Sequence, residues 1–455
     1  MASNSNSNSN SNSTTTTTST VILGAGIIGL STAYYLARHQ QPGDTIHLVE
    51  PSPELFAAAS GSAGGFLARD WFGPGAASLG ALSFDEHRRL AEAHGGAERW
   101  GYSRSTALSY TSGWPGAAAR GQVQRGAEDW LRHGTSRADA AGGGGGASST
   151  ARHDDDGDGG GDAATLVPPW LRPGKGASVK AIGDAETTAQ LDPRRLCRFL
   201  LDECLARGVR LHHPARATAV LTGPGRDGSE LLSGVTIAGA AGAPAGADVP
   251  CARLIIAAGP WSPQVFTELF PASRTRLPVS SLAGYSVVLR SPRWTRALEG
   301  KGCHAVFTTT RSGFAPELFS RVGGEIYVAG LNSPSLPLPG LATEGEVRRE
   351  AVDEVRRVAA RLLGPAEGAG DDLELVREGL CFRPVTPYGT PIVSRINDEH
   401  LGGGITTRPD AEGGVFVAAG HGPWGISHSL GTGMVLAEIC QGRHLSADVR
   451  SLVIW

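Results

Sequence analysis

Residues 21–29, Val-Ile-Leu-Gly-Ala-Gly-Ile-Ile-Gly, decide the fold of this chain. The apolar run predicts a buried strand, and the three glycines after it have the G-x-G-x-x-G spacing of a dinucleotide-binding turn. Residues 27–38 predict a helix, and residues 45–49 predict a second strand that leads to Glu50. Strand, glycine turn, helix, strand and acid in this order predict a Rossmann-like dinucleotide-binding unit.

The three glycines and the acid each have a physical role in such a unit. Gly24 makes the tight turn, Gly26 lets a pyrophosphate approach the backbone, and Gly29 lets the helix pack closely on the strand. The helix N-terminus presents unpaired N–H groups and the positive end of its dipole to the phosphates. Glu50 can accept hydrogen bonds from a ribose hydroxyl and would repel a 2′-phosphate, so NADP is not expected.

Composition limits the class of protein. The chain has 455 residues, which fits two domains, and a formal net charge of −3 without a basic stripe, so nucleic acid is not an expected partner. No apolar run approaches the ~18–20 residues of a membrane span, and residues 1–19 lack the features of a secretory signal. The six cysteines are scattered without a C-x-x-C pair, which predicts reduced thiols in a cytoplasmic protein and no metal site.

Two segments contain too few apolar residues to form a core. Residues 1–19 consist almost entirely of Ser, Asn and Thr and predict a disordered tail. Residues 132–164 include five consecutive glycines at 142–146 and an acidic stretch at 154–158, and predict a disordered insertion in a loop. The glycines of this insertion follow no strand, so no phosphate-binding loop is expected there.

The rest of the chain alternates between helices and strands. Asp192 and Pro193 predict the start of a helix that Gly208 closes, and Thr343 with Glu346 predicts a capping box for a helix through residue 363. A closing helix is predicted at 427–440. Strands are predicted at 209–213, 217–222, 234–238, 253–258, 284–289, 305–307, 325–329 and 415–419. This order predicts an α/β domain built from discontinuous segments that carries a second domain as insertions.

Three further motifs accompany the first glycine turn. They are Ser-Gly-Ser-Ala-Gly-Gly at 60–65, Ala-Ala-Gly-Pro-Trp-Ser at 257–262, and a closing pair, Cys-Phe-Arg-Pro-Val-Thr at 381–386 with the glycine-rich segment 420–433. In this order the motifs resemble the D-amino-acid-oxidase superfamily of FAD enzymes, which includes glycine oxidase and sarcosine oxidase. Within that superfamily the chain looks like uncharacterised fungal and plant FAD-dependent oxidoreductases.

The resemblance implies a mixed α/β fold in which a Rossmann-like FAD-binding domain carries an inserted antiparallel-β substrate domain. The FAD-binding domain is expected to comprise residues 20–80, 184–270 and 375–455. The substrate domain is expected to comprise residues 81–183 and 271–374.

The end of the chain favours FAD over NAD. Reduction of a flavin places negative charge at its N1–C2=O edge, and the turn at 420–425 with the helix after it supplies N–H groups and a dipole there. No second G-x-G-x-x-G follows a strand, which disfavours the two-nucleotide plan of disulfide reductases. His421 is expected to be a turn residue near the flavin and not a base. The predicted cofactor-binding residues are Gly24, Gly26, Ile27, Ile28, Gly29, Glu50, Pro51, Ser60, Ser62, Ala63, Gly64, Ala258, Gly259, Trp261, Cys381, Gly420, His421, Gly422, Trp424, Gly425 and Ile426.

Arg383 is the predicted substrate-binding residue. In glycine oxidase and D-amino-acid oxidase an arginine in a similar Arg-Pro turn binds the substrate carboxylate, and residues 381–384 match that turn. A guanidinium pairs with a carboxylate through two parallel hydrogen bonds, which fixes the substrate for hydride transfer. The alternative is an arginine that binds nearby carbonyls or an acid. Cys381 occupies the position that carries the flavin covalently in sarcosine oxidases, although a small buried cysteine fits the motif equally well.

Pro423 and Trp424 stand where sarcosine oxidase and glycine oxidase have a second cationic residue. Trp424 is expected either to cap the active site for a substrate bulkier than glycine or to pack in the core. Tyr285, together with Arg321 and Tyr327, is a candidate for the far wall of the substrate pocket, with ordinary sheet packing as the alternative.

These features predict a flavoenzyme that oxidises the C–N bond of an amino acid or secondary-amine acid, its small-molecule partner, by hydride transfer to FAD. The alternative is an FAD-binding scaffold or regulatory protein without significant turnover. An NAD-linked dehydrogenase is a weaker third reading.

Overall fold

The computed structural model describes residues 18–112, 167–225, 228–239, 246–309, 314–365 and 372–455. The predicted insertion at 132–164 lies outside these residues, as does the predicted tail apart from Thr18 and Ser19. Ser19 begins the first strand, although the sequence placed it in the predicted tail.

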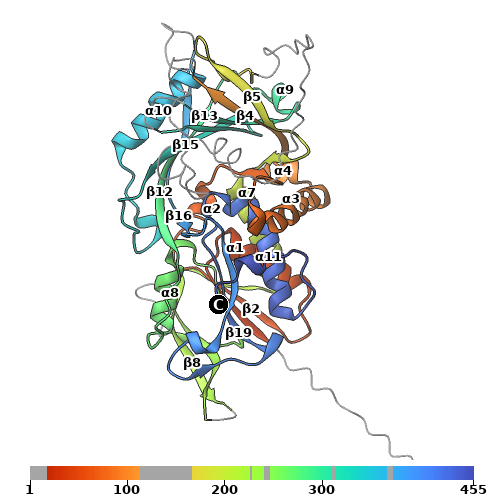
Figure 1. Cartoon of the computed structure of the whole chain (residues 1–455), viewed down its shortest axis with the longest axis vertical. Coiled ribbons are helices and arrows are strands. Elements are labelled where there is room, and N and C mark those ends of the chain that lie inside the picture. Colours follow the sequence, from red (N-terminus) through yellow and green to blue (C-terminus); the bar gives the residue numbers. More distant parts are fainter. Residues whose placement is uncertain (1–17, 113–166, 226–227, 240–245, 310–313, 366–371) are drawn as a thin grey trace, which may run out of the picture.

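A six-stranded sheet forms the lower half of the molecule in Figure 1, in the order β17-β19-β11-β1-β2-β7. Neighbouring strands are parallel except β17, which runs antiparallel to β19. The strands are β1 (Ser19–Leu23), β2 (Thr45–Val49), β7 (Arg210–His212), β11 (Arg253–Ile256), β17 (Ile392–Ile396) and β19 (Gly414–Ala419). The first two match the predicted dinucleotide-binding unit.

The strands of this sheet are apolar throughout because both faces are covered. On β1, Ile22 packs into the cluster beneath the helices, whereas Val21 and Leu23 pack into the cluster on the other face. The helices on the first face are α1 (Ile27–Arg38), α3 (Pro74–His94), α7 (Pro193–Ala206) and α11 (Gly425–Gln441). The other face carries α8 (Ser262–Leu269) and a small sheet of β8 (Ala215–Pro224), β9 (Glu230–Gly239), β10 (Ala247–Pro250) and β18 (Ile405–Thr406).

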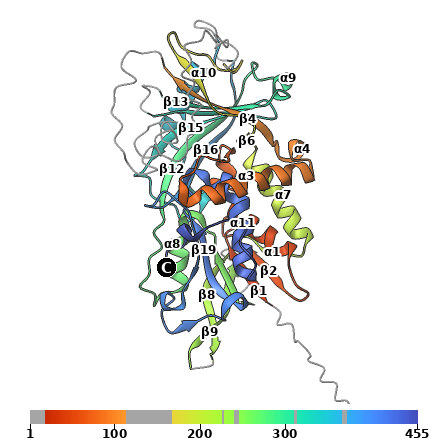
Figure 2. The same cartoon turned by 45° about the vertical axis from the view of Figure 1, so that its right-hand side comes forward.

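A nine-stranded sheet forms the upper half, and Figure 2 shows that the long strands β12 and β16 descend from it toward the parallel sheet. Its pairs are antiparallel except β13 with β4, and α10 (Arg349–Leu363) packs on its outer face. The strands are β3 (Phe66–Ala68), β4 (Ser103–Thr111), β5 (Ser178–Gly183), β6 (Thr188–Gln190), β12 (Ser280–Arg290), β13 (Cys303–Thr309), β14 (Glu317–Arg321), β15 (Glu325–Ser333) and β16 (Glu374–Val385). Three short helices complete the main elements, namely α2 (Ala59–Ser62), α4 (Gly96–Trp100) and α9 (Arg296–Glu299).

Membership of the two sheets does not follow the predicted domain bounds everywhere. Strands β3, β6 and β16 belong to the upper sheet although their residues fall in segments expected in the FAD-binding domain. Helix α3 extends past residue 80 but packs against α11 below. The domain bounds therefore stay a prediction, whereas the mixed α/β architecture is confirmed.

Helix capping was predicted correctly for α7 and incorrectly for α10. The Asp192 carboxylate accepts hydrogen bonds from the N–H groups of Arg194 and Arg195, at 2.8 and 3.1 Å, as an N-cap residue does. The predicted capping box of Thr343 and Glu346 is absent, and α10 begins after Arg348, which provides no side-chain cap. A 3₁₀ turn at Ala342–Glu344 takes its place, and the extended residue after it separates the turn from the helix.

Among the described residues, no helix is both long enough and apolar enough to cross a membrane. All six cysteines are buried and none forms a disulfide, in agreement with the predicted reduced thiols.

Candidate functional site

One large cavity lies between the carboxyl ends of the parallel strands and the inner face of the upper sheet. This edge of a parallel sheet is where open α/β folds bind ligands. Gly26, from the first glycine turn, and Gly422, from the closing turn, both line this cavity. The predicted residues that line it are Gly24, Gly26, Ile27, Ile28, Glu50, Pro51, Ser60, Ala63, Gly64, Ala258, Gly259, Trp261, Cys381, Arg383, His421, Gly422, Gly425 and Ile426. Motifs that are almost 400 residues apart in the chain therefore meet at one site.

The first glycine turn is too tight for any side chain. Gly24 has a φ of +108°, and a Cβ on it would lie 2.5 Å from the carbonyl oxygen of Ala257, which directly follows β11. A Cβ on Gly29 would lie 1.9 Å from the carbonyl oxygen of Gly24. Gly29 does not line the cavity, and its role is to let α1 start directly against the turn.

Ser60 fixes the second motif against the start of α1. Its hydroxyl oxygen accepts a hydrogen bond from the N–H of Ile27, at 2.9 Å. A Cβ on Gly26 would lie 3.1 Å from the Ser60 hydroxyl oxygen, so glycine at this position lets the loop pack closely on the turn. The segment around Ser60 and the N-terminus of α1 thus form one continuous wall of the cavity.

The Glu50 carboxylate is held at the carboxyl end of β2. It accepts hydrogen bonds from the N–H groups of Ala25 and Ser52, each at 3.0 Å. Burial raises the pKa of Glu50, while these two N–H groups oppose that shift by stabilising the ionised form. Nearby, Arg216 and Glu268 line the same cavity.

Trp261 lies at another side of the cavity. Its indole N–H donates a hydrogen bond to the carbonyl oxygen of Pro339, at 2.7 Å. Residues 340–342, which follow in the chain, also line the cavity. The connection between β15 and α10 therefore forms the part of the cavity wall that contacts Trp261.

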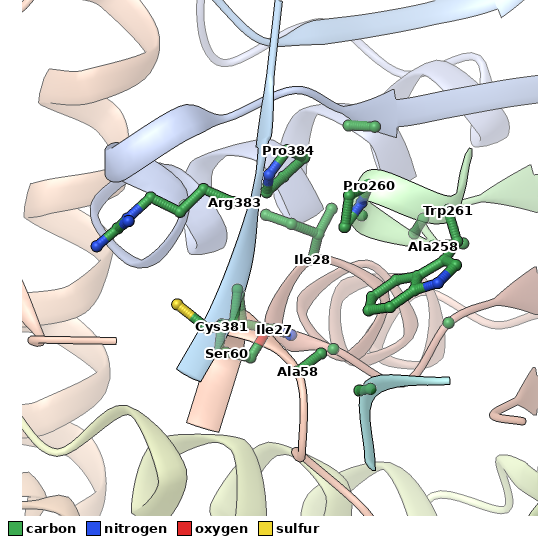
Figure 3. Close-up of a pocket in the computed structure, with 18 of the residues that line it drawn as sticks. Ile27, Ile28, Ala58, Ser60, Ala258, Pro260, Trp261, Cys381, Arg383 and Pro384 are labelled. Atoms are coloured by element: carbon green, nitrogen blue, oxygen red, sulfur yellow. Dashed lines mark hydrogen bonds between the residues drawn. The ribbon is translucent and has the colours of Figure 1, made fainter. Parts of the chain in front are cut away.

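Cys381 and Arg383 project from the same side of β16, as residues two apart on a strand do (Figure 3). In this view Ile27 and Ile28 lie between these two side chains and Trp261. The Arg383 Nη1 donates a hydrogen bond to the Oδ1 of Asn332 on β15, at 2.7 Å. Burial raises the pKa of the Cys381 thiol.

The closing turn brings neutral groups to the cavity. Gly420 and Gly422 have φ values of +79° and +54°, and α11 begins at Gly425. His421 is buried, its Nε2 lies 3.1 Å from the Oγ1 of Thr432, and desolvation lowers its pKa to about 3. The positive potential at this turn therefore comes from backbone N–H groups and the start of α11, and not from an imidazolium.

Comparison with known proteins identifies the family. A family model described as FAD dependent oxidoreductase matches residues 19–439. The chain belongs to this family. A Schizosaccharomyces pombe protein, whose name gives no more than the class oxidoreductase, is 26% identical over 94% of this chain and 96% of its own length. A D-amino acid dehydrogenase of Xanthobacter autotrophicus is 26% identical over 58% of this chain and 51% of its own length.

The solved structures support the fold. Glycine oxidase from Geobacillus kaustophilus superposes with a TM-score of 0.65 at 19% identity, over 96% of this chain and 98% of that one. At this identity the match shows the fold alone. It confirms the predicted Rossmann-like architecture.

FAD is the cofactor of this family, and the cavity fits it. The glycine turn leaves space that a Cβ would fill, the start of α1 faces the cavity, and the partly buried carboxylate of Glu50 lies at the end of β2. The cavity also extends to the inner face of the upper sheet, where a flavin ring and a substrate can be accommodated. The protein is therefore an FAD-dependent oxidoreductase.

Six predicted residues do not line the cavity, namely Gly29, Ser62, Gly420, Trp424, Tyr285 and Arg321. A Cβ on Gly420 would lie 2.3 Å from Thr386, so this glycine lets the turn pack closely. Trp424 packs edge-on against Phe72, with ring centroids 4.9 Å apart, and joins an aromatic cluster beside the site. Trp424 is therefore a packing residue at the edge of this cluster, and its role in capping the active site stays a prediction.

Tyr285 is misplaced by the sequence prediction. Alternate residues of β12 point to opposite faces, and Tyr285 packs with Val287 and Leu289 in the cluster beneath α10. Val288 points the other way, into the aromatic cluster beside the cavity. Tyr285 therefore belongs to the outer face of the upper sheet and cannot reach a substrate in the cavity.

Part of the cavity wall that the upper sheet provides was not predicted from the sequence. Phe66, Glu317 and Phe319 line the cavity together with Tyr327, which was a candidate. Glu317 and Phe319 are two residues apart on β14, so the alternating pattern of that strand would have placed both on one face. Asn332 was missed because the register of three strands, and no local motif, brings it to Arg383.

Proposed function

We propose that this protein oxidises the C–N bond of an amino acid or secondary-amine acid, and that Arg383 binds the substrate carboxylate. The observation that carries the proposal is the position of Arg383 on the wall of the cavity that also contains the glycine turn. A cation there can hold a carboxylate beside the cofactor. The sequence relative named D-amino acid dehydrogenase supports the same class of substrate.

Arg383 is oriented in a way that suits a bidentate contact. Asn332 binds Nη1, which fixes the plane of the guanidinium. Within the described residues no partner binds Nε or Nη2, so the edge that these two nitrogens share is available for two parallel hydrogen bonds. Asn332 is thus a positioning residue for Arg383.

The surrounding residues define the rest of the pocket. FAD, when bound, supplies the acceptor for the two electrons removed from the substrate. Phe66, Phe319 and Tyr327 are each less than 5% exposed and form an apolar wall that excludes water. The neutral His421 and the backbone of the closing turn offer hydrogen bonds without adding a fixed charge.

The test is anaerobic mixing of the FAD-loaded enzyme with D-amino acids, glycine, sarcosine and proline analogues, followed by the visible flavin absorption. Bleaching by at least one compound is expected in the unmodified enzyme. Arg383→Gln is expected to retain FAD and to require at least ~10-fold more substrate for half-maximal bleaching, since a charged hydrogen bond contributes about 1.5–3 kcal/mol.

Arg290→Gln is the matched control, because Arg290 is a half-exposed arginine at the far end of β12. Equal substrate requirements in Arg383→Gln and Arg290→Gln would refute the role of Arg383. No bleaching by any compound, with FAD retained, would favour the alternative of an FAD-binding scaffold.

A further inference from the structure

Arg321 is a buried arginine directly behind the cavity wall. It ends β14, and its side chain is 1% exposed. Its Nη2 donates hydrogen bonds to the carbonyl oxygens of Ala63 and Gly64, at 2.6 and 2.7 Å, and its Nε reaches the latter at 3.1 Å. Both carbonyls belong to the loop that lines the cavity, so the guanidinium is fixed relative to that loop.

The positive charge of Arg321 lacks a direct counter-ion. Within the described part of the chain it forms no ion pair, and Asp192 and Glu325 act on it only from a greater distance. Its Nη1 is buried, and no described residue accepts a hydrogen bond from it. A buried guanidinium remains protonated, and leaving it unpaired is costly unless another group uses the charge.

Cross-linking the loop does not require a cation. Gln190, a neutral residue, already donates a hydrogen bond to the carbonyl oxygen of Gly64, at 2.6 Å. A second amide could complete the same contacts without the desolvation of a charge. The feature that needs explanation is therefore the buried positive charge of Arg321, and not its hydrogen bonds alone.

The charge lies one layer of atoms from the cavity. The Cζ of Arg321 is 4.9 Å from the ring centroid of Tyr327, which lines the cavity. A Cβ on Gly64 would lie 3.1 Å from the Tyr327 ring and 2.5 Å from Phe319, so no water layer separates the loop from these rings. In such a dry environment a charge acts more strongly than it does in water.

We propose that Arg321 is the fixed cation that stabilises the reduced form of the bound FAD. Transfer of a hydride from a substrate carbon brings two electrons and one proton to the cofactor, and so adds one negative charge to it. A cation held beside that charge makes reduction more favourable. The proposal depends on FAD binding but not on the identity of the substrate.

The test compares the midpoint potential and the sulfite affinity of FAD in the unmodified enzyme, Arg321→Gln and Arg321→Lys. Sulfite adds to oxidised flavin and leaves a negative charge on it, so its affinity reports the same electrostatic effect. Arg321→Gln is expected to weaken sulfite binding about 10-fold and to lower the potential by about 30 mV, the equivalent for a two-electron couple. Arg321→Lys, which keeps the charge, is expected to recover most of both values.

A purely structural role predicts a different pattern. If the charge is irrelevant, Arg321→Gln and Arg321→Lys will have equal potentials and equal sulfite affinities, whatever their thermal stabilities, and the proposal fails. If Arg321→Gln does not retain FAD, the test is the midpoint potential of FAD bound to the unmodified enzyme, compared with that of free FAD. A bound potential above that of free FAD then supports the proposal, and one below it overturns the proposal.

Discussion

Substitution of Gly284 by alanine tests the role of Arg383 without removing the arginine. Gly284 lies on β12, opposite Asn332 on one neighbouring strand and Cys381 on the other. A Cβ at this position would lie 2.0 Å from the Nη1 and 2.7 Å from the Cζ of Arg383. These distances are too short for contact, so the guanidinium must move away from its bond with Asn332.

The movement is expected to affect substrate binding far more than stability. The displaced atoms are the far end of a flexible side chain, and alanine in a strand is itself favoured over glycine by about 0.5–1 kcal/mol. The melting temperature is therefore expected to change by no more than ~2 °C. Loss of one charged hydrogen bond to the substrate carboxylate corresponds to about 1.5–3 kcal/mol, or roughly a 10- to 150-fold weaker apparent Kd.

The assay is an anaerobic titration of the FAD-loaded enzyme with the compound that bleaches the unmodified protein best. Gly223→Ala is the matched control, since Gly223 lies on β8 and nothing stands within 4 Å of its Cβ position. An apparent Kd in Gly284→Ala that equals the value in Gly223→Ala would refute the proposed contact. A large loss of stability in Gly284→Ala would refute the inference that the guanidinium yields easily.

Two further predictions concern buried groups near the cofactor. Burial raises the pKa of the Cys381 thiol and so disfavours the thiolate needed for covalent attachment; acid precipitation is expected to leave all flavin in the supernatant, and a yellow pellet would contradict this. His428 is buried on α11, its two ring nitrogens have no hydrogen-bond partner among the described residues, and desolvation lowers its pKa to about 3. In the unfolded chain the imidazole of His428 is protonated below pH ~6.5, whereas in the folded protein it stays neutral down to a pH of about 3. The buried His428 therefore lowers the free energy of unfolding as the pH falls through this window, by up to ~1.4 kcal/mol per pH unit. His428→Leu is expected to reduce the fall in melting temperature between pH 7 and pH 5, and an unchanged pH dependence would contradict the assignment.

Local sequence signals were sufficient where one short segment determines its own conformation. The turn after β1 needs glycine at Gly24 because its φ is positive and its Cβ site is blocked by Ala257. The start of α7 needs the Asp192 side chain because the first N–H groups of a helix have no partners of their own. Both features are visible without knowledge of the rest of the chain.

The signals failed where long-range pairing chooses between two faces. The alternation of β12 was visible, but the face that meets α10 depends on which strands flank β12. Tyr285 was therefore placed on the wrong side of the sheet. The contact between Arg383 and Asn332 joins residues 51 apart in sequence and depends on the same strand order.

The electrostatics of the site show this limit most clearly. The sequence led us to expect positive potential from the backbone of the closing turn, and His421 is neutral at that turn. The buried charge comes instead from the end of β14, where Arg321, a candidate for the pocket wall, lies behind that wall. The carbonyl oxygens that bind Arg321 lie 257 and 258 residues earlier in the chain, so only the folded structure brings them together. If the potential of the cofactor depends on Arg321, the redox function of this protein rests on a contact between the end of β14 and the loop before β3, and changes in how β14 packs on this loop will alter the potential.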